Sequence, residues 1–285
     1  MTTGFIGIGS MGMAMAVNLH RKGRQVCVYD IREEALATAR AHGITTCGSA
    51  AEVAVQSDLI VIVVVNAKQI DDVLFGAGDA ARAAAGKTVM VCSTIAPEDT
   101  EAIAAKLAAQ GVKMIDAPIS GGPARAEAGT MSIMLAGEDA TIAPHQPELD
   151  AMSDKIFRLS TRIGDGARYK LVNNLAAGIN LVGAAEVIAL GLKIGLDKDK
   201  LLALMSASSG QSMMLEDRMT RALQDDYAPR AHAHILTKDV ALGCAMAKPT
   251  GQAMAMSINA LEVLKATLAC GYEDLDDGVV LKILL

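Results

Sequence analysis

Short apolar runs alternate with amphipathic, alanine-rich segments throughout the first half of the chain. The apolar runs are four to seven residues long, which is typical of strands that are buried on both faces of a sheet. They lie at Gly4–Ile8, Gln25–Tyr29, Leu59–Val65, Thr88–Cys92, Lys113–Asp116 and Met131–Ala136, and the helical segments include Ser10–Arg21, Glu33–Ala41, Ile70–Leu74 and Pro97–Ala109. This alternation predicts an α/β domain with a doubly wound parallel sheet.

The pattern changes after Gly164, where only helical periodicity remains. A segment from about Gly166 to Ile194 is apolar or small almost all round. A helix of about 28 residues is roughly 42 Å long, which is longer than a small domain is wide. We therefore expect this helix to be buried, to join two domains and to pack against a second subunit. The predicted division is a sheet domain at 1–163 and an all-helical domain at 164–285.

Gly7, Gly9 and Gly12 follow the first predicted strand at G-x-G-x-x-G spacing. In a dinucleotide-binding loop the first glycine permits a tight turn, the second lets a pyrophosphate approach the backbone, and the third lets the next helix pack closely. The helix that begins at Ser10 would direct its free N–H groups and its positive dipole end at the phosphates. Glycine-rich turns also occur in ordinary loops, but this one lies inside a strand–helix–strand unit. The sequence therefore predicts a Rossmann-type nucleotide site.

Asp30 ends the second predicted strand, eighteen residues after Gly12. An acidic residue there accepts hydrogen bonds from the ribose hydroxyls and repels a 2′-phosphate, so the expected cofactor is NAD rather than NADP. Arg32 is the alternative signal, because an arginine could contact a 2′-phosphate or simply line the adenine pocket. The strictness of the NAD preference stays open.

Length, charge and cysteine usage exclude several classes. A chain of 285 residues is long enough for two domains, and a net charge of −6 disfavours nucleic acid as a partner. No apolar run free of glycine and charge is long enough to span a membrane, so we expect no membrane partner. The first three residues carry no basic signal segment, which favours the cytoplasm. The cysteines show no metal-ligand spacing, and we assign no chemistry to Cys27, Cys47, Cys92, Cys244 and Cys270.

The segment Asp116–Gly122 follows a predicted strand and so lies at the carboxyl edge of the sheet, where ligands of open α/β folds bind. The Ser120 hydroxyl and the backbone N–H groups of Gly121 and Gly122 together suit a carboxylate. A plain turn after a strand is the alternative interpretation.

Two lysines interrupt apolar helical segments. Lys170 and Asn174 are four residues apart and share one helix face. Burial lowers the pKa of a lysine from about 10.4 toward neutrality, where it can exchange a proton with a substrate hydroxyl. An exposed amine at the start of a helix is the competing interpretation. Lys238 precedes Asp239 in a second apolar run, where a simple salt bridge is equally consistent.

His232 and His234 are the one close pair among five histidines. On a helix, residues two apart do not share a face, so this spacing argues against a zinc site. We therefore expect no metal.

Taken together, these motifs resemble the β-hydroxyacid dehydrogenase family, which includes 3-hydroxyisobutyrate dehydrogenase, over nearly the whole chain. The matching segments are G-x-G-x-M-G at Gly7–Gly12, D-A-P-x-S-G-G at Asp116–Gly122, Lys170 with Asn174, and Lys238-Asp239. The resemblance implies a Rossmann-type domain followed by a helical domain like that of 6-phosphogluconate dehydrogenase. It also implies hydride transfer between NAD and a short hydroxy acid, with Lys170 as general acid/base.

The resemblance further implies roles for single residues. Ser120, Gly121 and Gly122 would hold the substrate carboxylate, Asn174 would position the substrate and Lys238 would complete the pocket. The expected cofactor-binding residues are Gly7, Gly9, Ser10, Met11, Gly12, Asp30, Ile31, Arg32, Val65, Asn66, Thr94 and Lys238.

Two segments, Val63–Gln69 and Glu273–Ile283, look most like the L-threonate dehydrogenase branch of the family. The expected substrate is a β-hydroxy or polyhydroxy acid, either similar to 3-hydroxyisobutyrate or a four-carbon sugar acid such as threonate. A homodimer or homotetramer is expected. A non-catalytic NAD sensor on the same fold and an imine reductase are the alternatives, although Lys170 argues against both.

Overall fold

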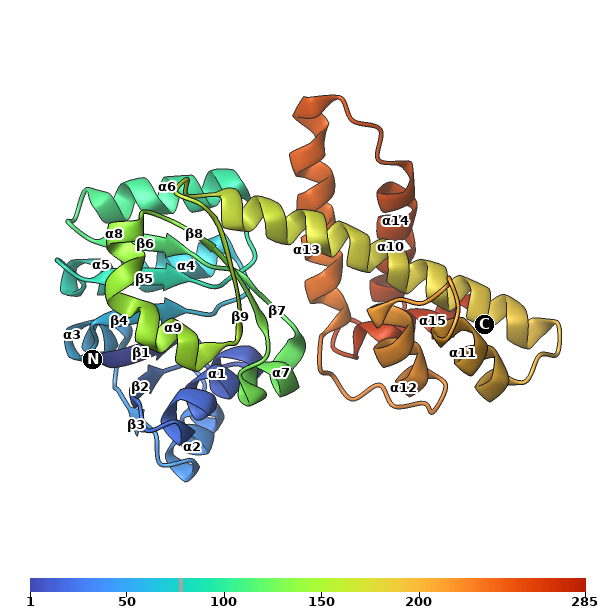
Figure 1. The fold of residues 1–285 in the computed structure, drawn as a ribbon, viewed down its shortest axis with the longest axis horizontal. Coiled ribbons are helices and arrows are strands. Elements are labelled where there is room, and N and C mark those ends of the chain that lie inside the picture. The colour runs from blue at the N-terminus through green and yellow to red at the C-terminus, as the bar shows by residue number, and fades with distance from the viewer. Residues whose placement is uncertain (77–78) are drawn as a thin grey trace. The chain divides into compact units, whose positions relative to one another are not determined.

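The computed structural model describes residues 1–76 and 79–285, which form two compact units, Met1–Lys170 and Leu171–Leu285 (Figure 1). The strands of the first unit are β1 (Thr2–Ile6), β2 (Gln25–Tyr29), β3 (Thr45–Thr46), β4 (Leu59–Ile62), β5 (Thr88–Val91), β6 (Lys113–Asp116), β7 (Ile119–Ser120), β8 (Ser132–Ala136) and β9 (Lys155–Ser160). Its helices are α1 (Ser10–Arg21), α2 (Glu33–Ala41), α3 (Ala50–Gln56), α4 (Ala67–Phe75), α5 (Ala80–Ala83), α6 (Pro97–Ala108), α7 (Gly122–Ala128), α8 (Asp139–Ile142), η1 (Ala143–His145) and α9 (Gln146–Met152).

The sheet has the strand order β3-β2-β1-β4-β5-β6-β8-β7, and β9 pairs with β8. The strands β1 to β6 are parallel, as the alternating pattern predicted. The predicted doubly wound sheet is present, with one antiparallel addition, since β8 runs antiparallel to both β6 and β7. β7 continues the register in which Asp116 of β6 pairs with Ala136, and α7 then leads the chain back into β8.

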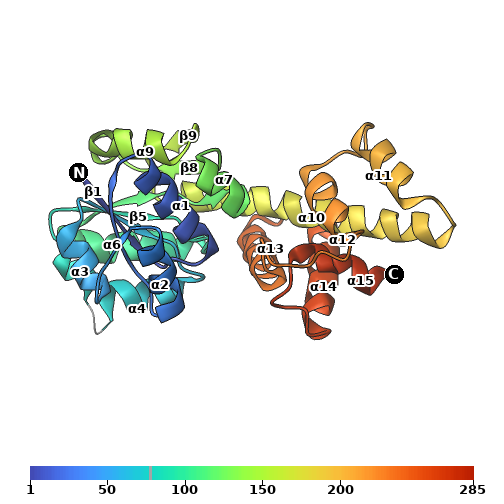
Figure 2. The ribbon, with the colours of Figure 1, turned by 90° about the horizontal axis from the view of Figure 1, so that it is seen from below.

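Consecutive strand residues point to opposite faces of this sheet, and each face has its own core. Phe5, Val28 and Val61 pack with residues of α1, α2 and α7 to α9, whereas their neighbours Ile6 and Ile60 pack with residues of α3 to α6. Figure 2 shows α9 on one side of the sheet and α3 and α4 on the other. Burial on both faces explains why these strands appear in the sequence as continuous apolar runs.

Two predicted strand ends are wrong by a few residues, each for a local reason. β1 ends at Ile6 because Gly7 turns the chain with φ of +86°. β4 ends at Ile62 instead of Val65, because Val63 to Asn66 lead into α4, whose first turn is capped by the Asn66 side chain. The elements β3, α3, β7 and β9 were not predicted.

The second unit is helical and begins within the longest helix of the chain. The helices are α10 (Asp165–Lys193), which starts in the first unit, α11 (Lys198–Ser206), η2 (Leu215–Met219), α12 (Thr220–Ala222), α13 (Ala233–Ala247), η3 (Lys248–Thr250), α14 (Ala255–Ala269), η4 (Asp277–Val279) and α15 (Val280–Leu284). Helices α13 and α14 lie side by side (Figure 1). Glycines of α10 permit close packing, since a Cβ on Gly178 would lie 2.7 Å from Val240.

The apolar composition of α10 is only partly explained by burial. Half of its most apolar 18-residue window is buried, although its length and hydropathy alone would be sufficient to cross a membrane. Val172 and Leu190 are each 58% exposed. Part of this helix is therefore exposed in the single chain, and its packing against a second subunit stays a prediction.

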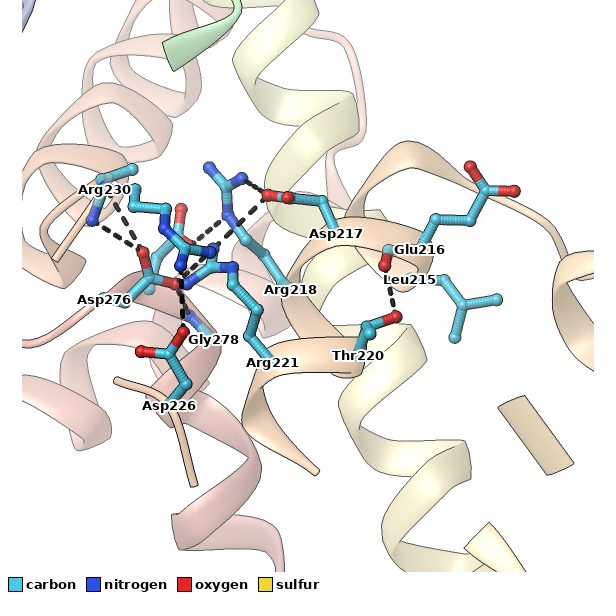
Figure 3. A network of polar contacts seen from close by, with 12 residues as sticks. Leu215, Glu216, Asp217, Arg218, Thr220, Arg221, Asp226, Arg230, Asp276 and Gly278 are labelled. Atoms are coloured by element: carbon cyan, nitrogen blue, oxygen red, sulfur yellow. Dashed lines mark hydrogen bonds and ion pairs between the residues drawn. The ribbon is translucent and has the colours of Figure 1, made fainter. Parts of the chain in front are cut away.

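A polar network in the second unit joins the segment around η2 to Asp276–Gly278, just before α15 (Figure 3). Arg218 donates to Asp277 at 2.7 Å, and Arg221 pairs with Asp276 at 3.0 Å. Asp276 also accepts from the backbone N–H of Arg230. Burial raises the pKa of Asp277 to about 6 despite the neighbouring Arg218 guanidinium. The network therefore connects η2 and α12 to the segment that leads into α15.

Candidate functional site

The glycine loop between β1 and α1 has the geometry of a nucleotide cradle. A Cβ on Gly7 would lie 2.4 Å from the carbonyl oxygen of Val63, and a Cβ on Gly12 would lie 2.1 Å from the carbonyl oxygen of Gly7. Both positions therefore need glycine for the chain to pack at all. By contrast, the nearest atom to a Cβ on Gly9 would be a terminal nitrogen of Arg32, 3.8 Å away. The space beside Gly9 is where a pyrophosphate would approach the backbone, so the loop fits a dinucleotide.

Asp30 is buried at the end of β2 and is held by four hydrogen bonds. Its carboxylate accepts from the backbone N–H of Ile8 at 2.8 Å and of Arg32 at 3.0 Å. The Arg32 guanidinium adds two bonds, at 3.0 and 3.1 Å. Burial by itself would raise the pKa of Asp30, but the hydrogen bonds from Arg32 and Ile8 hold it below the usual range. Ile31, which lies between Asp30 and Arg32 in the sequence, is 88% exposed.

Three further expected cofactor contacts, Val65, Asn66 and Thr94, follow the carboxyl ends of β4 and β5. Asn66 caps α4 by accepting from the backbone N–H of Gln69 at 2.9 Å, and the N–H of Val65 donates to the Gln69 side chain at 2.8 Å. Thr94 follows β5 and is half-buried. Since β1 and β4 are neighbours whose connections leave in opposite directions, these residues border the crevice where such sheets bind ligands.

The segment Asp116–Gly122 runs from the end of β6 through β7 to the start of α7. Gly121 and Gly122 have φ values of +134° and +76°, which favour glycine, and a Cβ on Gly122 would point into open space. Both glycines stand at the start of α7, where backbone N–H groups have no acceptor within the helix. The loop can therefore offer two adjacent donors, with the Ser120 hydroxyl beside them.

Asp116 has a role that the sequence did not indicate. Its buried carboxylate accepts from the backbone N–H of Gly164 at 2.9 Å and of Ala167 at 3.2 Å, so it caps the first turn of α10. A Cβ on Gly166 would lie within 2.9 Å of the same carboxyl group. Burial raises the pKa of Asp116 to about 6, and the backbone hydrogen bonds only partly oppose this. Asp116 thus connects the glycine turn to the helix that carries Lys170.

Lys170 stands in the second turn of α10 and is 7% exposed, so the interpretation as an exposed amine is wrong. The start of this helix is further braced by Arg168, which donates to Glu101 at 2.7 Å and to Asp165 at 3.1 Å. Asn174 follows one turn later and is also buried. Lys170 and Asn174 are therefore carried by a helix whose first turn is bonded to both Asp116 and Glu101.

Asp239 holds two of the polar side chains that were predicted to bind substrate, Asn174 and Lys238. Its carboxylate accepts from the amide of Asn174 at 2.7 Å and pairs with the Lys238 ammonium at 2.9 Å. Asp239 is buried, whereas the Lys238 side chain is 26% exposed. The salt bridge left open by the sequence is present, and it belongs to a cluster that also fixes Asn174. Nothing in the local sequence indicated the Asn174 bond, which joins residues 65 positions apart.

Three of the five cysteines are buried inside the first unit. All five are free, and Cys27, Cys47 and Cys92 are buried. Burial, together with the neighbouring Cys27, raises the pKa of Cys47 to about 12, which keeps the thiol protonated at neutral pH.

Known proteins resemble this chain over nearly its whole length. A family model described as the NAD binding domain of 6-phosphogluconate dehydrogenase matches residues 2–160, and one described as NAD-binding of NADP-dependent 3-hydroxyisobutyrate dehydrogenase matches residues 164–284. L-threonate dehydrogenase of Cupriavidus necator is 37% identical over 98% of this chain and 95% of its own. The crystal structure of 3-hydroxyisobutyrate dehydrogenase from Salmonella typhimurium superposes with a TM-score of 0.93 at 36% identity, covering 99% of both chains.

A second solved structure, Psf3 in complex with NADP⁺ and 2-OPP, also superposes with a TM-score of 0.93, at 26% identity and covering 99% of this chain and all of that one. The matched models and the glycine cradle identify the protein as an oxidoreductase that uses a nicotinamide dinucleotide. The chain belongs to the β-hydroxyacid dehydrogenase family, and its similarity to L-threonate dehydrogenases extends over nearly its whole length.

Proposed function

We propose that the protein is an NAD-dependent dehydrogenase of short hydroxy acids, and that 1–163 binds the cofactor while 164–285 contributes substrate binding and subunit contacts. The observation that carries this proposal is the buried Lys170 on a helix whose first turn is capped by Asp116. Bound NAD supplies a hydride acceptor at its nicotinamide ring. Lys170 takes the proton of the substrate hydroxyl as the hydride leaves, and returns it in the reverse direction.

The substrate carboxylate is bound by the Ser120 hydroxyl, the N–H groups of Gly121 and Gly122, and the Lys238 ammonium. Gly121 and Gly122 carry no side chain that could obstruct an anion, and Lys238 adds a positive charge. Asn174 donates to the substrate or orients Lys170. Its amide can do so from a fixed position, because it is itself held by Asp239. The ligands named for the relatives, L-threonate and 3-hydroxyisobutyrate, are both short hydroxy acids, which supports this substrate class.

NAD is the proposed cofactor, bound by Gly7, Gly9, Ser10, Met11 and Gly12, with Asp30 directed at the ribose. The ionised Asp30 carboxylate repels a 2′-phosphate. Ile31, Arg32, Val65, Asn66, Thr94 and Lys238 complete the proposed contacts. Arg32 must release the Asp30 carboxylate before both ribose hydroxyls can bond to it. The released guanidinium could then contact the 2′-phosphate of NADP, so this movement decides how well NADP competes.

We further propose that the enzyme works as a homodimer or homotetramer in the cytoplasm, with a second copy covering the exposed apolar residues of α10. Val172, Val187 and Leu190 together give this helix more exposed apolar surface than a solvated helix needs. Five free cysteines agree with a reducing compartment.

A spectrophotometric screen tests the proposed reaction. The purified protein is assayed for NAD and NADP reduction with 3-hydroxyisobutyrate, glycerate, threonate, erythronate, 3-hydroxypropionate and serine, and with the amide of the best acid. Loss of the carboxylate charge should lower kcat/KM roughly 30- to 150-fold, or about 2–3 kcal/mol. Gly122→Val should do similar harm by obstructing the loop. Tight NAD binding without turnover of any acid would instead indicate a sensor, and equal rates with the amide would refute the carboxylate loop.

A further inference from the structure

His232 and His234 are close together in the second unit, although their spacing in the sequence argued against it. The argument assumed that one helix carries both residues, but α13 begins at Ala233, and His232 precedes it in an extended conformation. His232 instead forms an antiparallel bridge with Asp276. The two imidazole rings lie 5.3 Å apart between centroids, with a tilt of 31°. The premise used to dismiss a metal site is therefore wrong.

Both rings are anchored to the same short segment by the same ring nitrogen. Nδ1 of His232 lies 2.9 Å from the carbonyl oxygen of Asp274, and Nδ1 of His234 lies 2.8 Å from the carbonyl oxygen of Glu273. A carbonyl oxygen can only accept, so each Nδ1 carries the proton. In a neutral imidazole this leaves the lone pair on Nε2. Metal-binding histidines are commonly oriented by such a bond from the other ring nitrogen to a backbone carbonyl.

A carboxylate stands next to the two rings. One ring nitrogen of each histidine and one carboxylate oxygen of Asp274 all lie within 4.8 Å of one another. The Asp274 side chain is 85% exposed, and its Oδ1 is 3.8 Å from Nδ1 of His234. The carboxylate can therefore turn toward an ion bound by the rings without disturbing the core.

We propose that His232, His234 and Asp274 form a binding site for a divalent transition-metal ion, with zinc as the expected occupant. Imidazole nitrogen selects zinc, copper or nickel over magnesium and calcium, which prefer oxygen ligands. Two histidines and one carboxylate leave a fourth position for water. The ion joins Glu273–Asp274 to the first turn of α13, one helical turn before Lys238.

Zinc titration of the full-length protein tests the site. The protein is purified without a histidine tag, treated with EDTA, desalted and titrated by calorimetry, and Co²⁺ absorption reports the coordination. We expect one zinc per chain with a micromolar dissociation constant, and a zinc-dependent rise in melting temperature. Absence of saturable binding would overturn the proposal.

Variants locate the ion. His232→Gln and His234→Gln should each weaken zinc binding by at least about tenfold, and Asp274→Asn should weaken it less, because the imidazoles remain. Melting curves recorded in EDTA check that each variant folds, and Asp274→Asn tests the site without disturbing the ring anchors. His42→Gln, at an exposed histidine elsewhere, and Cys270→Ser are the controls and should bind zinc as the unchanged protein does. Unaltered binding in the double histidine variant, or loss of binding in Cys270→Ser, would refute the assignment.

Discussion

Asp116 in the first unit and Asp239 in the second are both buried carboxylates next to a proposed catalytic or binding group, but their partners differ. Asp116 accepts only backbone N–H bonds from the start of α10, and burial raises its pKa to about 6. Asp239 is bonded to the Asn174 amide and is balanced by the Lys238 ammonium. The first carboxylate therefore positions a helix and is sensitive to pH, whereas the second positions two side chains and is neutralised locally.

Replacing the two lysines should separate proton transfer from substrate binding. Lys170→Ala should lower kcat by roughly 10²–10⁴-fold while NAD affinity stays nearly unchanged, because the general acid/base is lost. Lys238→Ala should act mainly on KM, since it removes a charge that binds substrate and product alike. Steady-state kinetics and NAD titration of both variants give the comparison. A Lys170→Ala enzyme with near-normal kcat would show that the proton leaves by another group.

Two variants of Asp239 test its hydrogen bond with Asn174, because one of them keeps an acceptor for that bond and the other does not. Asp239→Leu leaves the Asn174 amide without its acceptor and Lys238 without its counter-charge, so the free energy of unfolding should fall by about 1–3 kcal/mol, with a larger relative loss of kcat/KM. Asp239→Asn can still accept from Asn174 and should retain more stability than the Leu variant. Urea unfolding and kinetics distinguish the two. Equal stability in both variants would contradict the importance of the Asn174 bond.

The contrast between these sites also explains what the sequence could predict. The glycine loop, α1 and β2 form a local unit in which spacing, strand and helix agree, so their bounds were predicted to the residue for Ser10–Arg21 and Gln25–Tyr29. The Asp116 cap joins residues 48 apart and the Asp239–Asn174 bond joins residues 65 apart. No local pattern encodes such contacts, because they depend on how distant elements pack.

The remaining errors have similar causes. β7 and β9 are short or half-exposed strands that are specified by pairing with β8 rather than by an apolar run. The proximity of His232 and His234 was not predicted, because both were assigned to one helix, whereas α13 begins at Ala233, one residue after His232. Boundaries are decided by caps and long-range bridges, here the pairing of His232 with Asp276.

The pH dependence of Asp116 offers a second test of the contrast. The native pKa of about 6 exceeds the ordinary 3.8, so the native state binds the proton more tightly than the unfolded chain. The stability that this group contributes is present below about pH 4 and is lost as pH rises through 6, which amounts to about 3 kcal/mol. Asp116→Asn keeps an acceptor for the helix N–H groups but cannot ionise. Relative to the unchanged protein, the variant should gain stability between pH 4 and 7 in urea unfolding, and parallel curves would contradict the raised pKa.

A further test concerns a third buried carboxylate, Asp30, which differs from the other two because the Arg32 guanidinium is bonded to it. Arg32→Ala removes two hydrogen bonds to Asp30 and leaves the carboxylate oxygens available to the ribose, so NAD should bind no more weakly and NADP should bind more weakly. Asp30→Ser should do the opposite and erode the NAD preference, with each lost charge-assisted bond contributing about 1.5–3 kcal/mol. The ratio of kcat/KM values for the two cofactors measures both changes. Equal efficiency with NADP in the unmutated enzyme would refute Asp30 as the selecting residue, and Arg32 would then be assigned to the 2′-phosphate.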